Sequence, residues 1–378
     1  MKKNKINLYH SSLGKVLSSR KRKVALNSIK NLLDYKELCD VSDSLIKSIQ
    51  PLNFSFFGNP FPKTLEEFGK GEMLFKPLLL ENEFKWTFLS FRKFNKEIIK
   101  FLSLKHNFEK FFLLGDYNSS EKVLNEILYD YGYSIWYIEA KFLLLEYQNK
   151  SEDQKEFLSE INKANQNLFV GTLAHFLSFR TEKNLSAYKY DYDIKSLFSR
   201  SKKDDEREVR QYYSFRLNYF ENYKLEDYSM LLVFENCNSL IDRYLLSIDL
   251  LKVLSLEKDT QDLAFSKALY LFRKTKDLNL LPLLVFRDIS LVTKEYIDIE
   301  YLKILDFYYT GKYNDAIEKI KSYINNNPSN FDLLIIYIRC FINLNLEIQP
   351  ILGNKESLID QITIKIYKLL KETSNRSE

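Results

Sequence analysis

Apolar residues in the C-terminal third of the chain recur three and four positions apart. In the stretch 311–328 they are Ala316, Ile317, Ile320, Tyr323 and Ile324, and polar residues fill the positions between them. With 3.6 residues per turn, this spacing places the apolar residues on one face of a helix. The pattern predicts an amphipathic helix that packs by this face against a neighbouring helix.

A glycine and a proline bound this predicted helix. Gly311 stands before it and Pro328 after it. Glycine adopts the left-handed conformation that ends a preceding helix, and proline cannot continue a helix because it has no amide hydrogen. The stretch Tyr301–Tyr309 before the glycine and the stretch Phe331–Leu344 after the proline repeat the same spacing. We therefore predict three consecutive helices that pack back on one another.

A second passage with this organisation lies upstream, between Gly115 and Gly132. Its apolar stripe consists of Val123, Leu124, Ile127, Leu128 and Tyr131. The turn glycine and the helix breaker are 17 residues apart in both passages. The chain has few alanines, and those at 140, 174, 264, 268 and 316 lie within apolar helical stripes. We expect these small residues to lie where two helices touch.

Together these features resemble the tetratricopeptide repeat, in which a turn glycine, a small contact residue and a stop residue frame a pair of helices. The resemblance covers about 108–165 and 295–345, and extends with less detail to about 240–280. Gly115 and Gly311 are not separated by a whole number of 34-residue repeats, so an insertion or another helical hairpin intervenes. The resemblance implies an all-α fold of antiparallel helix pairs stacked as a right-handed α-solenoid with a helical N-terminal cap.

The first hundred residues differ from the rest. Four of the seven prolines and three of the nine glycines lie between 51 and 77, which predicts an irregular segment between helical regions. The segment is too rich in phenylalanine and leucine for disorder, so we expect a packed loop that contacts another part of the chain. The alternative is a docking arm for a partner. We predict an N-terminal helical region over 1–105, which includes this loop, and a repeat solenoid over 106–378.

Charge and composition restrict the possible partners. The net charge is +5, and the obvious basic run is Arg20, Lys21, Arg22 and Lys23. Such a run can neutralise phosphates, but acidic and basic residues are otherwise mixed, so a solvated helix face is the better interpretation. No uncharged stretch approaches the ~20 residues of a membrane span, and the basic N-terminus lacks the apolar core of a secretory signal. We expect a cytoplasmic protein.

One spacing is typical of an enzyme. Asp130, Glu139 and Lys141 match the carboxylate and lysine spacing of restriction-endonuclease-type nucleases, whose Mg²⁺ chemistry requires these residues on adjoining strands. The surrounding pattern is helical, which favours helix-surface residues instead. We find no glycine-rich phosphate loop and no histidine pair at zinc spacing. We expect no catalytic residue, cofactor or metal; an enzyme assembled from scattered residues is the alternative.

The implied activity is binding, because solenoids of this kind take an extended peptide or a helix along the face of their first helices. We expect Tyr137, Lys141, Tyr337 and Arg339 to face outward and contact the partner. The sequence thus predicts a non-catalytic protein-binding scaffold or adaptor. The alternative is a nucleic-acid-associated or regulatory subunit of a multi-protein bacterial system, such as a defence or mobile-element module, which the basic N-terminus permits.

Overall fold

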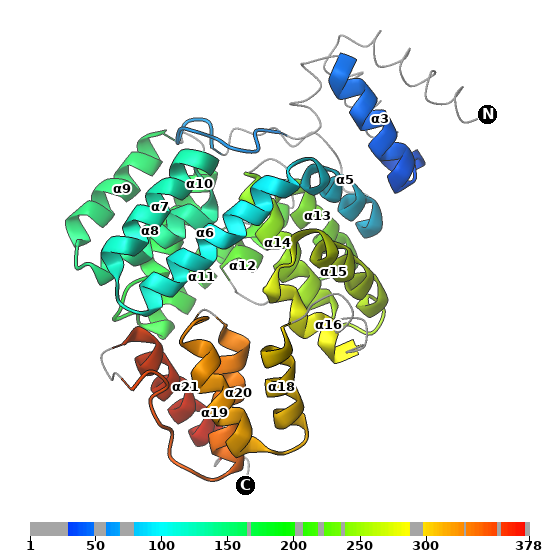
Figure 1. Cartoon of the computed structure of the whole chain (residues 1–378). Helices are drawn as coiled ribbons and strands as arrows, with labels where there is room; N and C mark the ends of the chain where they lie inside the picture. The colour runs from blue at the N-terminus through cyan, green and yellow to red at the C-terminus, as the bar shows by residue number, and fades with distance from the viewer. Residues whose placement is uncertain are drawn as a thin grey trace. The chain divides into compact units, whose positions relative to one another are not determined.

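The structure, a computed structural model, describes residues 29–48, 58–68, 79–164, 168–200, 207–217, 223–235, 239–287, 298–328, 330–353 and 357–374. Throughout these ranges the chain forms helices joined by turns and loops, without a strand (Figure 1). The all-α prediction is therefore confirmed for the described part of the chain. The basic run Arg20, Lys21, Arg22 and Lys23 lies outside it.

The fold divides into two compact units, one formed by residues 1–99 and 126–275 and the other by residues 100–125 and 276–378. Helices of the first unit are α3 (Tyr35–Ser48), α5 (Leu80–Lys93), α8 (Ile135–Tyr147), α9 (Ser151–Ala164), α10 (Leu168–Arg180), α11 (Ala187–Arg200), α12 (Arg207–Arg216), α13 (Leu225–Glu235), α14 (Leu240–Leu254) and α15 (Gln261–Thr275). Those of the second are η2 (Leu278–Leu280), α16 (Leu281–Arg287), α18 (Ile299–Tyr309), α19 (Tyr313–Ile324), α20 (Phe331–Asn343) and α21 (Leu358–Ser374). The ranges of α6 (Asn95–Leu113) and α7 (Tyr117–Tyr131) include residues of both units. The boundary near residue 105 stays a prediction.

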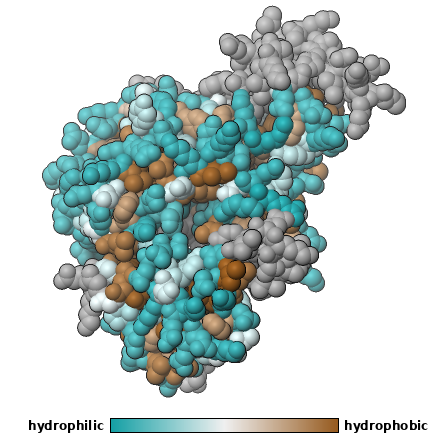
Figure 2. Space-filling model, viewed as in Figure 1, coloured by the Kyte–Doolittle hydropathy of each residue, from teal (hydrophilic) through white to brown (hydrophobic). Residues whose placement is uncertain are grey.

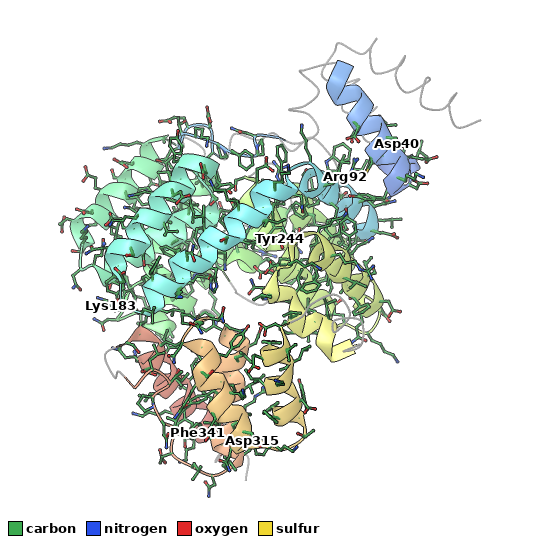
Figure 3. The ribbon with its side chains drawn as sticks, viewed as in Figure 1. Asp40, Arg92, Lys183, Tyr244, Asp315 and Phe341 are labelled. Atoms are coloured by element: carbon green, nitrogen blue, oxygen red, sulfur yellow. The ribbon has the colours of Figure 1, made fainter. Side chains whose placement is uncertain are left out.

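Helix α14 is the central element of the first unit. It packs against α13 and α15, its neighbours along the chain, and also against α5 and α8, which are far from it in sequence. Tyr244 of α14, labelled in Figure 3, is fully buried. Its ring meets Phe91 edge to face, with the centroids 5.4 Å apart, and its hydroxyl lies 3.1 Å from that of Thr275. A helix buried on this many sides holds the unit together through apolar contact.

The second unit follows the predicted order of helices. Helix α18 packs on α19, α19 packs on α20, and α20 packs on α21. The predicted stripe of α19 is buried as expected, with Ala316 fully inaccessible, while Asp315 is exposed. Gly311 has a φ of +75°, the left-handed turn conformation that the sequence predicted. Phe341 of α20 is buried, and Figure 3 marks both Phe341 and Asp315.

The upstream passage also forms as predicted. Gly115 and Gly132 have φ values of +82° and +71°, and α7 lies between them. Leu124, Ile127 and Tyr131 of its stripe are buried, and the other two members are half-buried. The alanines at 140, 174, 264, 268 and 316 are all buried. Small residues therefore occupy interior positions of these helices, as expected.

The described part of the proline-rich segment, residues 58–68, is a packed loop. The carbonyl oxygen of Pro60 accepts the amide hydrogen of Leu240 at 2.9 Å, and that of Pro62 accepts the amide hydrogen of Tyr133 at 2.7 Å. The ring of Phe61 lies edge to face with those of Phe94 and Tyr131. The prediction that this loop contacts another part of the chain is confirmed for these residues, since the loop joins the start of α14 to the end of α7.

Candidate functional site

Two of the four residues expected to face a partner do not. Only 3% of Tyr137 and 0% of Tyr337 is accessible, so the prediction that they face outward is wrong. The Tyr137 ring packs edge to face on Tyr133, and the Tyr337 hydroxyl donates to the carbonyl oxygen of Gln349 at 3.0 Å. Helix α8 is apolar on several sides, so spacing alone does not identify its exposed side. On α20, Tyr337 belongs to an apolar stripe with Leu333, Leu334, Ile338 and Phe341, and this three-four spacing places it on the buried face.

The other two predicted residues are accessible. Arg339 is exposed on α20, and Lys141 is half-buried on α8. They belong to different compact units, so each marks a separate candidate surface.

The residues with nuclease-like spacing lie on helices. Asp130 is near the end of α7, and Glu139 and Lys141 lie in α8. Glu139 forms an ion pair with Arg180 of α10 at 2.5 Å. The helical interpretation of these residues is confirmed, and the strand arrangement that the nuclease chemistry requires is not formed here. Among the residues that the structure describes, no three histidine, cysteine or acidic side chains come together to hold a metal.

The sequence analysis missed a buried polar arrangement in the first unit. It is centred on Asp242, which is 0% exposed in the first turn of α14. Its carboxylate accepts the backbone amide of Ile135 at 2.8 Å and that of Trp136 at 3.1 Å. These amides begin α8, whose N-terminal N–H groups have no partner within their own helix. Asp242 therefore joins α14 to a helix that starts 107 positions earlier in the sequence.

Helices α12 and α13 complete this arrangement. Arg216 forms an ion pair with Glu235, and its guanidinium also donates to the backbone carbonyl oxygen of Asp242 at 3.2 Å. The Tyr212 hydroxyl donates to Glu235 at 2.8 Å. Glu235 is 1% exposed and Tyr212 is 0% exposed. We call the set Tyr212, Arg216, Glu235 and Asp242 the buried cluster.

Burial changes the acidity of the cluster. Removal from water, followed by the nearby Glu235 carboxylate, raises the pKa of Asp242 from 3.8 to about 7, against the opposing effects of Arg216 and the two α8 amides. The same two causes, burial and Glu235, raise the pKa of the Tyr212 phenol well above 10. Tyr212 is therefore a permanent donor, whereas Asp242 can change its protonation near neutral pH.

A sequence signal for Asp242 exists. Ser239 caps α14, and its hydroxyl accepts the backbone amide of Asp242 at 3.2 Å, the pairing typical of a Ser-x-x-acid helix start. The same four residues, Ser-Leu-Ile-Asp, occur at 239–242 and at 357–360. Asp360 is also 0% exposed and accepts the backbone amides of Ile351 and Leu352 at 2.6 and 3.3 Å. A repeated helix-start motif thus has a repeated use: its aspartate binds two consecutive amides of another segment.

Comparison with known proteins gives one partial similarity. A stretch of 165 residues, 44% of the chain, is 21% identical to the Detocs histidine-protein kinase DtcA of Enterobacter cloacae (strain JD6301). This stretch corresponds to 14% of that kinase, so the chain spans a small part of the relative's length. No family model and no solved structure matches the chain.

Proposed function

We propose that the chain is a non-catalytic protein-binding module of tetratricopeptide type, which presents the outer faces of its first helices to a protein or peptide partner. The observation that carries the proposal is that the pattern of buried and exposed residues on α18 recurs on α20, in the second unit. Several positions 33 residues apart on α18 and α20 have the same degree of exposure, and this separation is close to the 34-residue period of these repeats. The buried pairs are Tyr301 with Leu334, Ile304 with Tyr337 and Leu305 with Ile338.

The exposed positions that correspond on α18 and α20 carry charged side chains beside partly buried apolar ones. Asp306 and Arg339 are exposed and lie 33 positions apart. Neither side chain forms an ion pair with another described residue. Leu302 and Ile335, also 33 positions apart, are half-buried beside them. A charged group next to partly covered apolar surface suits a peptide that combines both features.

The face of the molecule in Figure 2 offers several places where a partner could bind. Figure 2 shows apolar side chains gathered in separate patches between larger hydrophilic areas. Arg339 on α20 and Lys141 on α8 remain the proposed partner contacts of the two units. No described helix combines the length and the apolar character that crossing a membrane requires.

Charge reversal tests this proposal. The tagged full chain, its Arg339→Glu and Asp306→Lys variants, and a control variant, Glu318→Lys on α19, would be used to capture partners for mass spectrometry. We expect the proteins captured by the wild type to be captured also by Glu318→Lys but not by Arg339→Glu or Asp306→Lys. Circular dichroism should show that the wild type and the three variants are all folded. Equal capture by all four proteins would contradict the proposal.

A regulatory subunit of a multi-protein bacterial system is the second candidate. The similarity to part of a histidine-protein kinase supports it, because the remainder of that kinase lies outside the matched stretch. In this case the chain would act on, or with, a separate kinase. Incubation of the purified chain with labelled ATP and a histidine-protein kinase separates the two functions: a pure binding module acquires no phosphate, whereas acid-labile phosphate that appears on the chain only when the kinase is present would favour a role in phosphotransfer.

A further inference from the structure

We propose that the turn between α18 and α19 binds an arginine side chain of the partner. This inference rests on the proposed binding function and assigns its partner to a chemical class, a protein segment that carries arginine. The feature that carries it is a group of tyrosine rings at the turn. We call these residues, Tyr308, Tyr309 and Tyr313, the tyrosine cluster.

The tyrosine cluster presents aromatic surface to solvent. Tyr309, the last residue of α18, is 69% exposed, and Tyr308 and Tyr313 are half-buried. The Tyr308 ring centroid lies 5.3 Å from that of Tyr309 and 6.1 Å from that of Tyr313, with the ring planes inclined at 66° and 56°. Rings at such angles do not stack face on face, so the exposed Tyr309 ring keeps surface for a ligand. The face of an aromatic ring is electronegative and attracts cations.

A cation already lies over a ring of the same turn. Lys312 Nζ is 6.0 Å from the centroid of the Phe307 ring. This contact within the chain has the geometry of a cation–π interaction, which stabilises pairs at exposed sites as well as buried ones. It also places the lysine charge over Phe307, a ring outside the tyrosine cluster. A second cation, supplied by a partner, can therefore use the Tyr309 ring.

The charge of the surrounding segment favours this second cation. Residues 298–319 include five acidic and three basic residues, whereas the whole chain has a net charge of +5. Lys303 and Lys319 both form ion pairs with Glu300, at 3.3 and 3.1 Å. The third lysine lies over the Phe307 ring. The basic residues of the segment are thus occupied within the fold, and an excess of negative charge is left over.

The excess charge lies on three exposed carboxylates, those of Asp306, Asp315 and Glu318. Within the part of the chain that the structure describes, none of the three forms an ion pair. Asp306 lies three residues before Tyr309 on α18, so the two side chains are neighbours on one face of the helix. A cation on the Tyr309 ring therefore has a carboxylate beside it. The same carboxylates repel a phosphate backbone, so the turn favours a basic protein segment over nucleic acid.

Arginine fits this pair of groups better than lysine does. A guanidinium is planar, so its face can stack on the Tyr309 ring while its N–H edge donates two parallel hydrogen bonds to the Asp306 carboxylate. A lysine ammonium is a compact and strongly hydrated point charge, which lacks both the flat face and the paired donors. The arrangement therefore predicts discrimination by shape as well as by charge.

Fluorescence anisotropy with three labelled peptides tests this subsite on the full chain, at about 0.15 M salt to screen distant charges. A tetra-arginine peptide would be compared with the corresponding lysine peptide and with the citrulline peptide, whose side chain is the neutral analogue of arginine. The wild type should bind the arginine peptide most tightly and the citrulline peptide least, because only arginine combines the charge with a planar group. Equal binding of the arginine and citrulline peptides would overturn the proposal.

Variants of Tyr309 locate the binding. Tyr309→Phe keeps the aromatic ring and should bind the arginine peptide as the wild type does, whereas Tyr309→Leu removes the ring and should weaken binding about two- to fivefold. Asp306→Asn should weaken binding by up to about fivefold. Tyr188→Leu on α11 is the matched control, since Tyr188 is 81% exposed and the neighbouring carboxylate of Asp191 is paired with Lys195. Unchanged binding by Tyr309→Leu, or an equal loss with Tyr188→Leu, would contradict the assignment.

The capture experiment separates this inference from the proposed function. Tyr309→Leu and Tyr309→Phe would be added to it, and circular dichroism would verify that both are folded. We expect the proteins captured by the wild type to be lost with Tyr309→Leu and kept with Tyr309→Phe. Proteins that are lost with Arg339→Glu but kept with Tyr309→Leu would overturn the arginine subsite and leave the proposed function standing. Equal capture by the wild type and every variant would overturn the proposed function, and the subsite with it as a partner contact.

Discussion

The carbonyl oxygen of Pro62 occupies the space that a side chain at position 132 would need. A Cβ atom on Gly132 would lie 1.9 Å from this oxygen, and the same oxygen accepts the Tyr133 amide at 2.7 Å. Lys63, the next residue of the loop, donates from Nζ to the carbonyl oxygens of Tyr129 and Asp130. A loop from the N-terminal part of the chain thus closes the C-terminal end of α7, where a cation complements the helix dipole.

This contact predicts a large difference between two glycine substitutions. Gly115 and Gly132 both have positive φ, but a Cβ on Gly115 would meet nothing within 4 Å. Gly115→Ala should therefore cost only the backbone strain of about 1–2 kcal/mol. Gly132→Ala should cost roughly 3 kcal/mol or more, because the loop must also move. Chemical unfolding of both variants measures this difference, and equal costs would show that the loop yields freely.

Ala316 should reject a larger side chain. It is 0% exposed in the buried stripe of α19, so the added methylenes of Ala316→Leu should separate α19 from its neighbours at a cost of about 1–3 kcal/mol. Ala316→Ser should be tolerated better because the volume changes little. Asn314→Leu, at an exposed position of the same helix, is the control. An Ala316→Leu protein with the melting temperature of the wild type would contradict a close helix contact.

The Tyr212 hydroxyl should contribute measurably to stability. It donates to Glu235 at 2.8 Å and accepts from Arg216 Nε at 3.3 Å, inside a buried environment. Tyr212→Phe removes both bonds and should lower the free energy of unfolding by about 1–3 kcal/mol. Tyr188→Phe makes the same chemical change at a residue that is 81% exposed, and should stay within about 0.5 kcal/mol of the wild type. Similar effects of the two variants would exclude a stabilising role for the buried hydroxyl.

Substitutions of Glu139 and Lys141 in α8 should affect the stability of the fold to different degrees, and neither should abolish a catalytic activity. Glu139→Ala leaves Arg180 without its ion-pair partner, which should cost up to about 1 kcal/mol because the pair is partly exposed. Lys141→Ala, two residues further along the same helix, should change the free energy of unfolding by less than about 0.5 kcal/mol. We expect no Mg²⁺-dependent DNA cleavage from the wild type. A cleavage activity that Glu139→Ala abolishes would refute the helix-surface interpretation.

The repeating spacing in 311–328 was enough to predict α19, its buried face and the turn at Gly311. These features depend on residues within a few positions of one another, and local spacing determines which side of an amphipathic helix is apolar. Exposure was predicted wrongly for one tyrosine of α8 and one of α20. Tyr137 lies on a helix with apolar residues on several sides, so only the arrangement of neighbouring helices determined that it is buried. Tyr337 lies in the apolar stripe of α20, so its burial could have been predicted from the spacing.

The sequence by itself determined the helical class, the turns and the small residues at interior positions, because each is set by local backbone preference and periodicity. The Ser-Leu-Ile-Asp segments show where this information ends. Each is recognisable as a helix start, yet the two amides that Asp242 binds lie 107 and 106 positions away in the chain. Only the tertiary structure brings them together and encloses Glu235 and Arg216 beside them. The pKa of Asp242 depends on that enclosure, because the cost of a buried charge is set by all of the groups around it.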